Sequence, residues 1–295
     1  MSEGGIGSMP QYLLALIALL SQPVAASAQV TQPGPRAGDV YEIRRVSDMT
    51  QSDGNGSSGS SHDADMLVER VIAVRDSGVE VEFDLPTETS AEDRARQWQF
   101  PARVLRPPQG PLQLLNAPEL TARVDRWLAL GSWTRAMCGR WIFTWNAFQI
   151  ECEPQSVVAA LAAVELRQDD VRDGATYRDP VGRGEAVLRR EAGSAAFVAE
   201  LAVDSDVLRR QQAESDAVLR EIMGDRSPAL RAAREARAPR RTSGTVRIRF
   251  ERDDAARTLR RTRVLTLETE RMDGVRENRT VTETVERQLV SEPAP

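Results

Sequence analysis

The chain has 295 residues and a formal net charge of −5, and its only histidine is His62. This length allows one large domain or two small ones, and the negative charge gives no electrostatic basis for binding nucleic acid. A single histidine leaves little room for a Ser-His-Asp triad or an ordinary zinc site. All 39 basic residues are arginine, which indicates a GC-rich coding sequence and hence a bacterial source.

The N-terminus has the pattern of a secretory signal peptide. Tyr12–Leu20 is an apolar run, and Ala26–Ala28 has the small-x-small form that signal peptidase accepts, although no Lys or Arg precedes the run. The run is shorter than the roughly 20 apolar residues that span a bilayer. We therefore predict a signal peptide over residues 1–28, a flexible leader over 29–38, and a periplasmic or secreted mature protein that does not span the membrane.

A strand is predicted over Val40–Val46, and a Gly/Ser-rich segment over Gly54–Asp65 is expected to be a flexible loop. Within that segment, His62, Asp63 and Asp65 have side chains that can ligate a metal. A loop that does not hold its ligands in place makes a poor metal site. A solvated polar loop is therefore the favoured interpretation, and no metal is expected.

The clearest β-hairpin in the sequence covers Val68–Leu85. In Val79–Leu85 apolar residues alternate strictly with acidic ones, which is typical of an antiparallel strand with one buried face. This pattern points Val81 and Phe83 into the core. Asp76–Gly78 suits a three-residue turn in which the glycine takes the left-handed conformation.

A further strand is predicted over Trp98–Leu105, followed by an irregular connection and a helix that begins near Asn116. Asn116 and Glu119 have the spacing of a capping box, and Gly131 is placed to end the helix. Further elements are expected in the rest of the chain: helices over 154–165 and 206–223, with Pro154 and Ser205 at their starts, and β structure over 186–203, 246–250, 264–267 and 281–289.

The segment Cys138–Cys152 is unusual in composition, because it holds both cysteines and several aromatic residues. A hairpin centred near Trp145 would set Cys138 opposite Cys152. Cysteines on facing strands can be bridged, and an exported protein meets oxidising conditions. We therefore predict a Cys138–Cys152 disulfide, which contributes on the order of 3 kcal/mol by the chain-entropy model.

The aromatic residues of this hairpin have two interpretations. Trp141, Phe143 and Trp145 share one face of it, and Trp133 lies just before it. If that face is exposed, the four residues form a candidate binding surface. If it is covered by the helices, they are part of the core, which is favoured because clustered aromatics more often fill cores.

A basic stretch over 226–241 is a candidate anion patch. Its candidate residues are Arg231, Arg234, Arg237 and Arg240. The stretch could bind lipid headgroups or a polyanionic glycan. A solvated, arginine-rich linker is favoured instead, because runs of charge are usually solvated.

The pattern of elements predicts an α+β fold. Antiparallel β meanders lie at both ends of the mature chain and are expected to join one sheet, packed by two or three helices. We expect a single domain over 39–295, with a candidate sub-boundary near 167–180.

No catalytic residues are assigned and no cofactor is expected. The sequence is most consistent with an exported, non-enzymatic envelope protein that binds or scaffolds an apolar ligand, such as a lipid, or a protein partner. In one form of the protein-partner hypothesis, the partner docks on the aromatic hairpin. The alternative is a secreted hydrolase built on carboxylates, for which any acid is a candidate. Those considered are Glu82, Asp84, Glu151, Glu153 and Asp179.

Overall fold

The computed structural model describes residues 34–143, 147–167, 170–223, 239–253, 258–271 and 274–291. The predicted signal peptide therefore lies outside the described residues, as do Trp145, Arg231, Arg234 and Arg237. The side chains of Phe143 and Arg240 are likewise not described.

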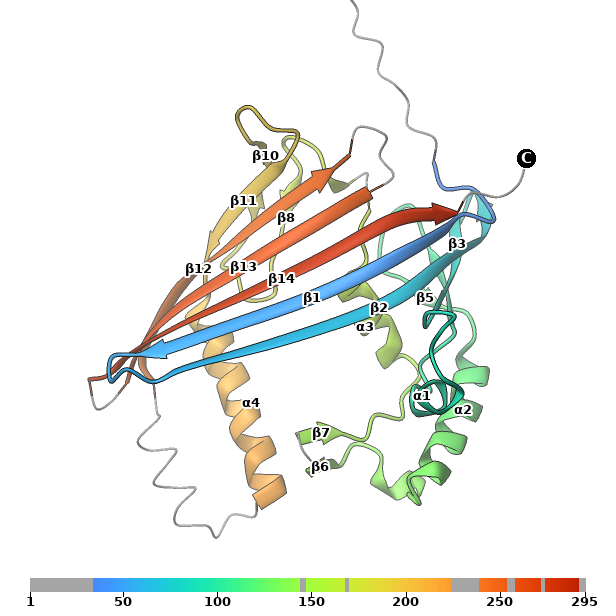
Figure 1. The fold of residues 1–295 in the computed structure, drawn as a ribbon, viewed down its shortest axis with the longest axis horizontal. Coiled ribbons are helices and arrows are strands. Elements are labelled where there is room, and N and C mark those ends of the chain that lie inside the picture. Colours follow the sequence, from blue (N-terminus) through green and yellow to red (C-terminus); the bar gives the residue numbers. More distant parts are fainter. Residues whose placement is uncertain are drawn as a thin grey trace, which may run out of the picture. The chain divides into compact units, whose positions relative to one another are not determined.

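Ten strands form one antiparallel sheet (Figure 1). Their order is β10 (Arg189–Arg190), β11 (Phe197–Ala202), β12 (Pro239–Arg252), β13 (Thr258–Arg271), β14 (Arg276–Ser291), β1 (Val40–Asp53), β2 (Ser58–Arg75), β3 (Gly78–Asp84), β4 (Ala102–Arg106) and β5 (Gln113–Leu114). The first and last long strands, β1 and β14, pair along their whole length. The two predicted meanders therefore join one sheet, as expected.

Helices are few beside this sheet. They are α1 (Ala91–Arg96), α2 (Ala117–Leu130), α3 (Ser156–Val164) and α4 (Ser205–Met223), with a short 3-10 turn at Arg135–Met137. Figure 1 shows all four on the same side of the sheet, and we call the sheet face on that side the inner face. Because antiparallel strands dominate, the expected α+β class is matched only in part. No helix among the described residues is both long and apolar enough to cross a membrane.

The core lies between the inner face and the helices. Val81 and Phe83 on β3 are fully buried, as the alternation predicts. The helices complete the same cluster with their apolar sides. The helix residues in it are Leu120, Val124, Leu128, Val157, Leu161 and Val164.

The predicted β2–β3 hairpin is confirmed, with one difference along β2. Glu69 and Val71 are buried, whereas Ile72 and Val74 are exposed. The register shifts between Val71 and Ala73, so a β-bulge at Ile72 breaks the simple alternation. The turn is also tighter than expected, because Arg75 pairs directly with Gly78.

The Gly/Ser-rich segment is a loop only over residues 54–57, and its remainder is strand, which corrects most of the prediction. Strand β2 already begins at Ser58, and β1 continues to Asp53, well past the predicted Val46. His62 pairs with Asp48 on β1, and its Nδ1 lies 2.7 Å from Asp48 Oδ1 at an exposed position. A partner strand here outweighs the weak strand propensity of Gly and Ser.

Two helix starts differ from their predicted caps. Asn116 stands at the N-cap position of α2, but its side chain makes no capping hydrogen bond. Its Oδ1 instead accepts a hydrogen bond from the Arg103 amide at 2.9 Å, and its Nδ2 donates to the Pro101 carbonyl at 3.2 Å. These bonds tie α2 to β4. Gly131 ends the helix as predicted.

Helix α4 is capped one residue earlier than expected. Asp204 Oδ1 accepts hydrogen bonds from the amides of Asp206 at 2.9 Å and Val207 at 3.4 Å. The hydrogen bond from the Asp206 amide lowers the pKa of Asp204. Asp204 rather than Ser205 therefore satisfies the free amides of the first turn.

The strand predicted over Trp98–Leu105 is shorter in the structure. It begins only at Ala102, and Trp98 lies buried in the segment before it. Helix α1 was not predicted, although Ser90 caps it by accepting a hydrogen bond from the Asp93 amide at 3.1 Å.

Candidate functional site

A fully buried carboxylate, Glu69, lies on the inner face of β2. Arg287 on β14 donates to it twice, at 2.8 and 3.0 Å, and Arg106 at the end of β4 donates at 3.0 and 3.1 Å. Burial alone would raise the pKa of Glu69, but the charges and hydrogen bonds of Arg287 and Arg106 outweigh burial and lower it to about 2. Glu69 is therefore ionised at neutral pH.

The network around Glu69 reaches beyond the sheet. Arg106 also donates to Glu165, just after α3, at 2.8 Å, and Arg167 donates to the same carboxylate at 2.9 Å. On the other side, the Arg287 guanidinium lies 3.3 Å from the centre of the Tyr41 ring, a cation–π contact. We call Arg287, Glu69, Arg106, Glu165 and Arg167 the first network.

A second network lies further along the inner face. Glu283 on β14 accepts from Arg45 on β1 at 2.9 Å and from Arg261 on β13 at 3.2 Å. Arg261 also donates to the Ala163 carbonyl near the end of α3 at 2.6 Å. The Nε atom of Arg261 is buried and has no hydrogen-bond partner among the described residues.

Asp179 forms a separate buried pair. Arg263 donates to its two oxygens at 2.6 and 2.9 Å, and the Val181 amide and the Tyr177 hydroxyl also donate to it. Burial opposes ionisation of Asp179, but the hydrogen bonds from Arg263 and Val181 prevail and lower its pKa. Burial, together with the Asp179 charge, raises the pKa of Tyr177 to about 12.

A partly open cleft of about 490 Å³ lies beside these networks. Its walls come from the segment after α3, from the region of two short strands, β8 (Thr176–Tyr177) and β9 (Ala186–Val187), and from β12 and β13. The apolar lining residues are Leu166, Val171, Ala175, Tyr177, Leu188 and Phe250. Tyr177 meets Phe250 edge to face, with ring centres 6.0 Å apart. The charged lining residues are Glu165, Arg167, Asp170, Arg172, Arg178 and Arg261.

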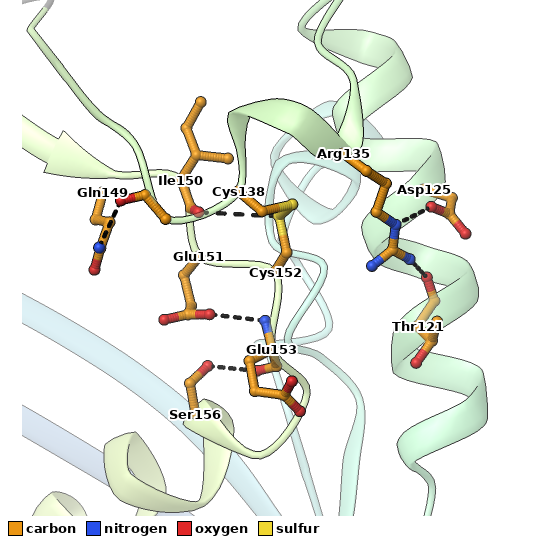
Figure 2. Close-up of a disulfide and its surroundings, with 11 residues drawn as sticks. Thr121, Asp125, Arg135, Cys138, Gln149, Ile150, Glu151, Cys152, Glu153 and Ser156 are labelled. Atoms are coloured by element: carbon orange, nitrogen blue, oxygen red, sulfur yellow. Dashed lines mark hydrogen bonds and ion pairs between the residues drawn. A yellow bond between two sulfur atoms is a disulfide. The ribbon is translucent and has the colours of Figure 1, made fainter.

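The cysteine hairpin forms as the sequence predicts. Strands β6 (Trp141–Phe143) and β7 (Ala147–Gln149) pair with Ile142 opposite Phe148, and Cys138 is bonded to Cys152 with Cα atoms 5.6 Å apart. Figure 2 shows the disulfide near α2, where Arg135 donates to Asp125 at 2.7 Å and to the Thr121 carbonyl at 3.3 Å. The hairpin is thus anchored at its base to a helix.

The structure does not bring the predicted aromatic surface together within the described residues. Trp133 packs against the rings of Trp127 and Phe148, at 5.4 and 6.4 Å, on the side of the hairpin that faces the core. Trp141 lies on the opposite side and is half-buried, and its amide donates to Glu221 of α4 at 3.3 Å.

The candidate acids do not form one site either. Glu82 and Asp84 on β3 pair with Arg70 and Arg94, at 3.7 and 2.9 Å. Glu151 accepts from the Glu153 amide beside the disulfide at 2.7 Å (Figure 2). Only Asp179 lies near the cleft, through its neighbour Tyr177. Across the described ranges, no group of three or more His, Cys, Asp or Glu is placed to hold a metal ion.

Comparisons with known proteins give a distant likeness. No family model matches the sequence, and no curated protein matches it. Among solved structures, the chain is similar to lipovitellin, in a structure that concerns lipid–protein interactions. The sequence identity is 9% and the TM-score is 0.34, and the match covers 88% of this chain and 26% of the lipovitellin chain.

Proposed function

We propose that this chain is an exported, non-enzymatic protein of the bacterial cell envelope, periplasmic or secreted, whose residues 39–295 form a single binding domain for an apolar ligand. In this proposal, residues 1–28 are removed on export and residues 29–38 form a loose leader. The observation that carries the proposal is the cleft beside β12 and β13, because six of its lining residues present apolar or aromatic side chains.

The size of the cleft supports a small-molecule ligand. Its volume of about 490 Å³ falls within the roughly 300–1,000 Å³ of typical ligand sites. The walls come from segments that are packed into the core, since Leu188 and Val171 are buried and Tyr177 packs on Phe250. A site with such walls is largely formed before the ligand arrives, which lowers the entropy lost on binding.

The alternative, a carboxylate-based hydrolase, is less well supported. A general acid must hold its proton near neutral pH, so its pKa has to be raised. Glu69 and Asp179 have fully buried side chains, and arginine hydrogen bonds lower the pKa of both. Both are therefore ionised partners of arginine and are poorly suited to donate a proton.

Native mass spectrometry of the protein purified from the envelope fraction tests the proposal. We expect an additional bound mass that organic extraction removes, and an N-terminus at Gln29. Ala175→Trp, which fills the cleft, should abolish the bound mass, whereas Ala64→Trp at an exposed site on β2 should retain it. An exported protein that carries no apolar mass but copurifies with a protein partner would favour the scaffold role instead.

A further inference from the structure

We infer that the ligand of the cleft is an anionic amphiphile: a molecule with an apolar body and one negatively charged group, such as a carboxylate, sulfonate or phosphate. The inference rests on the proposed function, because it specifies the ligand class of the same cleft. It is carried by the charge balance of the two ion-pair networks that end at this cleft.

Counting only the ion pairs between described residues, the first network has one more guanidinium than carboxylates. Arg287, Arg106 and Arg167 share two carboxylates, Glu69 and Glu165. Glu165 and Arg167 line the cleft, so the unbalanced positive charge lies at its wall.

The second network has the same excess among the described residues. Arg45 and Arg261 share the single carboxylate of Glu283, and Arg261 lines the cleft. At the rim, Arg178 is paired with Glu185, and Arg172 and Asp170 carry opposite charges. The charges of these described rim residues therefore cancel and do not offset the excess of the two networks.

The excess positive charge is energetically costly because the arginine side chains that carry it are largely buried. The side chains of Arg287, Arg106, Arg261 and Arg167 are only 7%, 10%, 15% and 19% exposed. A cation that is largely removed from water without a matching anion is costly, and the effect of each charge is stronger where the local dielectric is low. A singly charged anion bound in the cleft would offset part of this excess.

Arg261 also offers an unused donor. Its Nε atom has no partner among the described residues, although its Nη2 atom is engaged by Ala163 and Glu283. Guanidinium groups bind carboxylate, sulfonate and phosphate oxygens through paired N–H donors. A ligand oxygen beside the exposed part of the Arg261 guanidinium would pair with its charge, and a shift of the side chain would bring the buried Nε atom within reach.

The apolar wall distinguishes an amphiphile from a free anion. Among the apolar lining residues, Ala175 and Tyr177 are partly exposed, and inorganic phosphate has no apolar part that could pack against them. Burying an apolar body there is favourable in proportion to the apolar area removed from water. The cleft therefore favours a ligand that carries both parts.

Two fluorescent probes with the same apolar body separate these contributions. 1-Anilinonaphthalene-8-sulfonate carries a sulfonate, and N-phenyl-1-naphthylamine is its neutral counterpart. We expect the full-length mature protein to bind the sulfonate probe at least tenfold more tightly. Inorganic phosphate at equal concentration should not displace it. Equal affinity for both probes would overturn the inference while leaving an apolar-ligand function intact, and binding of neither probe would overturn both. Displacement by phosphate would indicate a simple anion site.

Variants locate the binding to the cleft. Arg261→Gln should weaken binding of the sulfonate probe about tenfold and leave binding of the neutral probe unchanged. Arg167→Gln at the cleft wall is the second variant if the first does not fold. Arg44→Gln, exposed on the opposite face of the sheet, is the control. If Arg44→Gln weakens the sulfonate probe as much as the cleft variants do, the binding reflects general charge and the inference is wrong.

Discussion

Glu69 and Arg287 lie 218 residues apart in the sequence and meet on the inner face of the sheet, with Nη2–Oε1 and Nε–Oε2 distances of 2.8 and 3.0 Å. Strand β1 runs between them, since Glu69 faces Tyr41 and Arg287 faces Ile43. The pair therefore bridges the two strands that flank β1. It helps to define the register that joins the N-terminal and C-terminal parts of the sheet.

Glu69→Gln should destabilise the protein strongly. It removes the charge that neutralises two buried guanidiniums, and breaking one partner of a buried ion pair costs about 3–5 kcal/mol. Urea unfolding followed by circular dichroism measures the loss. Glu82→Gln on the neighbouring strand is the control, because its contact with exposed Arg70 is 3.7 Å long and should contribute less than about 1 kcal/mol. A loss of similar size in both variants would mean that Glu69 does not organise the sheet.

Glu69 should also make the stability depend on acid. Its pKa is about 2 in the folded protein, against about 4.5 for an unperturbed glutamate, so the unfolded state binds more protons between these values. The stabilisation, on the order of 3 kcal/mol, is fully present above pH 4.5 and is lost as the pH falls through 2. Unfolding free energies measured across this range should fall less steeply in Glu69→Gln than in the natural protein.

Phe83→Asp should abolish folding. The Phe83 side chain is fully buried in the main cluster, so the variant loses its packing and buries an unpaired carboxylate. Removing the ring alone costs about 3–5 kcal/mol, and the charge adds to this. Asp84→Asn on the half-exposed side of the same strand should fold normally. Full stability of Phe83→Asp in thermal unfolding would show that the inner face of β3 is wrongly assigned.

Local patterns were sufficient to predict the β2–β3 hairpin, the disulfide hairpin and the presence of the three C-terminal strands, although these strands are longer than predicted. In Val79–Leu85 the alternation is strict, and the cysteine hairpin follows from symmetric pairing about its centre. Each of these signals lies within about 20 residues of sequence. The same local reasoning is wrong over residues 58–65, because only the pairing of β2 with β1 makes them a strand, whereas residues 54–57 form the predicted loop.

The ion-pair network of the candidate site could not be predicted from local sequence patterns. Glu69 looks like an ordinary polar strand residue until Arg106 and Arg287 are brought to it from distant strands. The sequence does indicate that Arg287 points inward. It lies two residues from both Val285 and Leu289 and therefore shares their side of the strand. Charged residues on an apolar strand face indicate buried pairs, but the sequence does not say which partner each one meets.

Removing the disulfide should lower stability without unfolding the protein. Cys138 and Cys152 close a loop with a sequence separation of 14, for which the chain-entropy model gives roughly 3 kcal/mol. The double variant Cys138→Ser/Cys152→Ser should unfold at lower urea concentration, with the first loss of hydrogen-exchange protection in β6 and β7. Alkylation of the exported natural protein under denaturing conditions, followed by mass measurement, should find no free thiol. Two free thiols would contradict the predicted bond.

Gly78→Ala should be far more costly than the same change at Gly56. Both glycines have positive φ, +133° and +85°, where a side chain is strained. A Cβ at Gly78 would lie 2.2 Å from the Arg106 carbonyl oxygen, whereas a Cβ at Gly56 meets nothing within 4 Å. Backbone strain alone should therefore cost Gly56→Ala about 1–2 kcal/mol. Gly78→Ala must also move β4 away from β3, which displaces Arg106 from Glu69. Equal losses for the two variants in urea unfolding would mean that the close approach of β3 and β4 at this turn is not required.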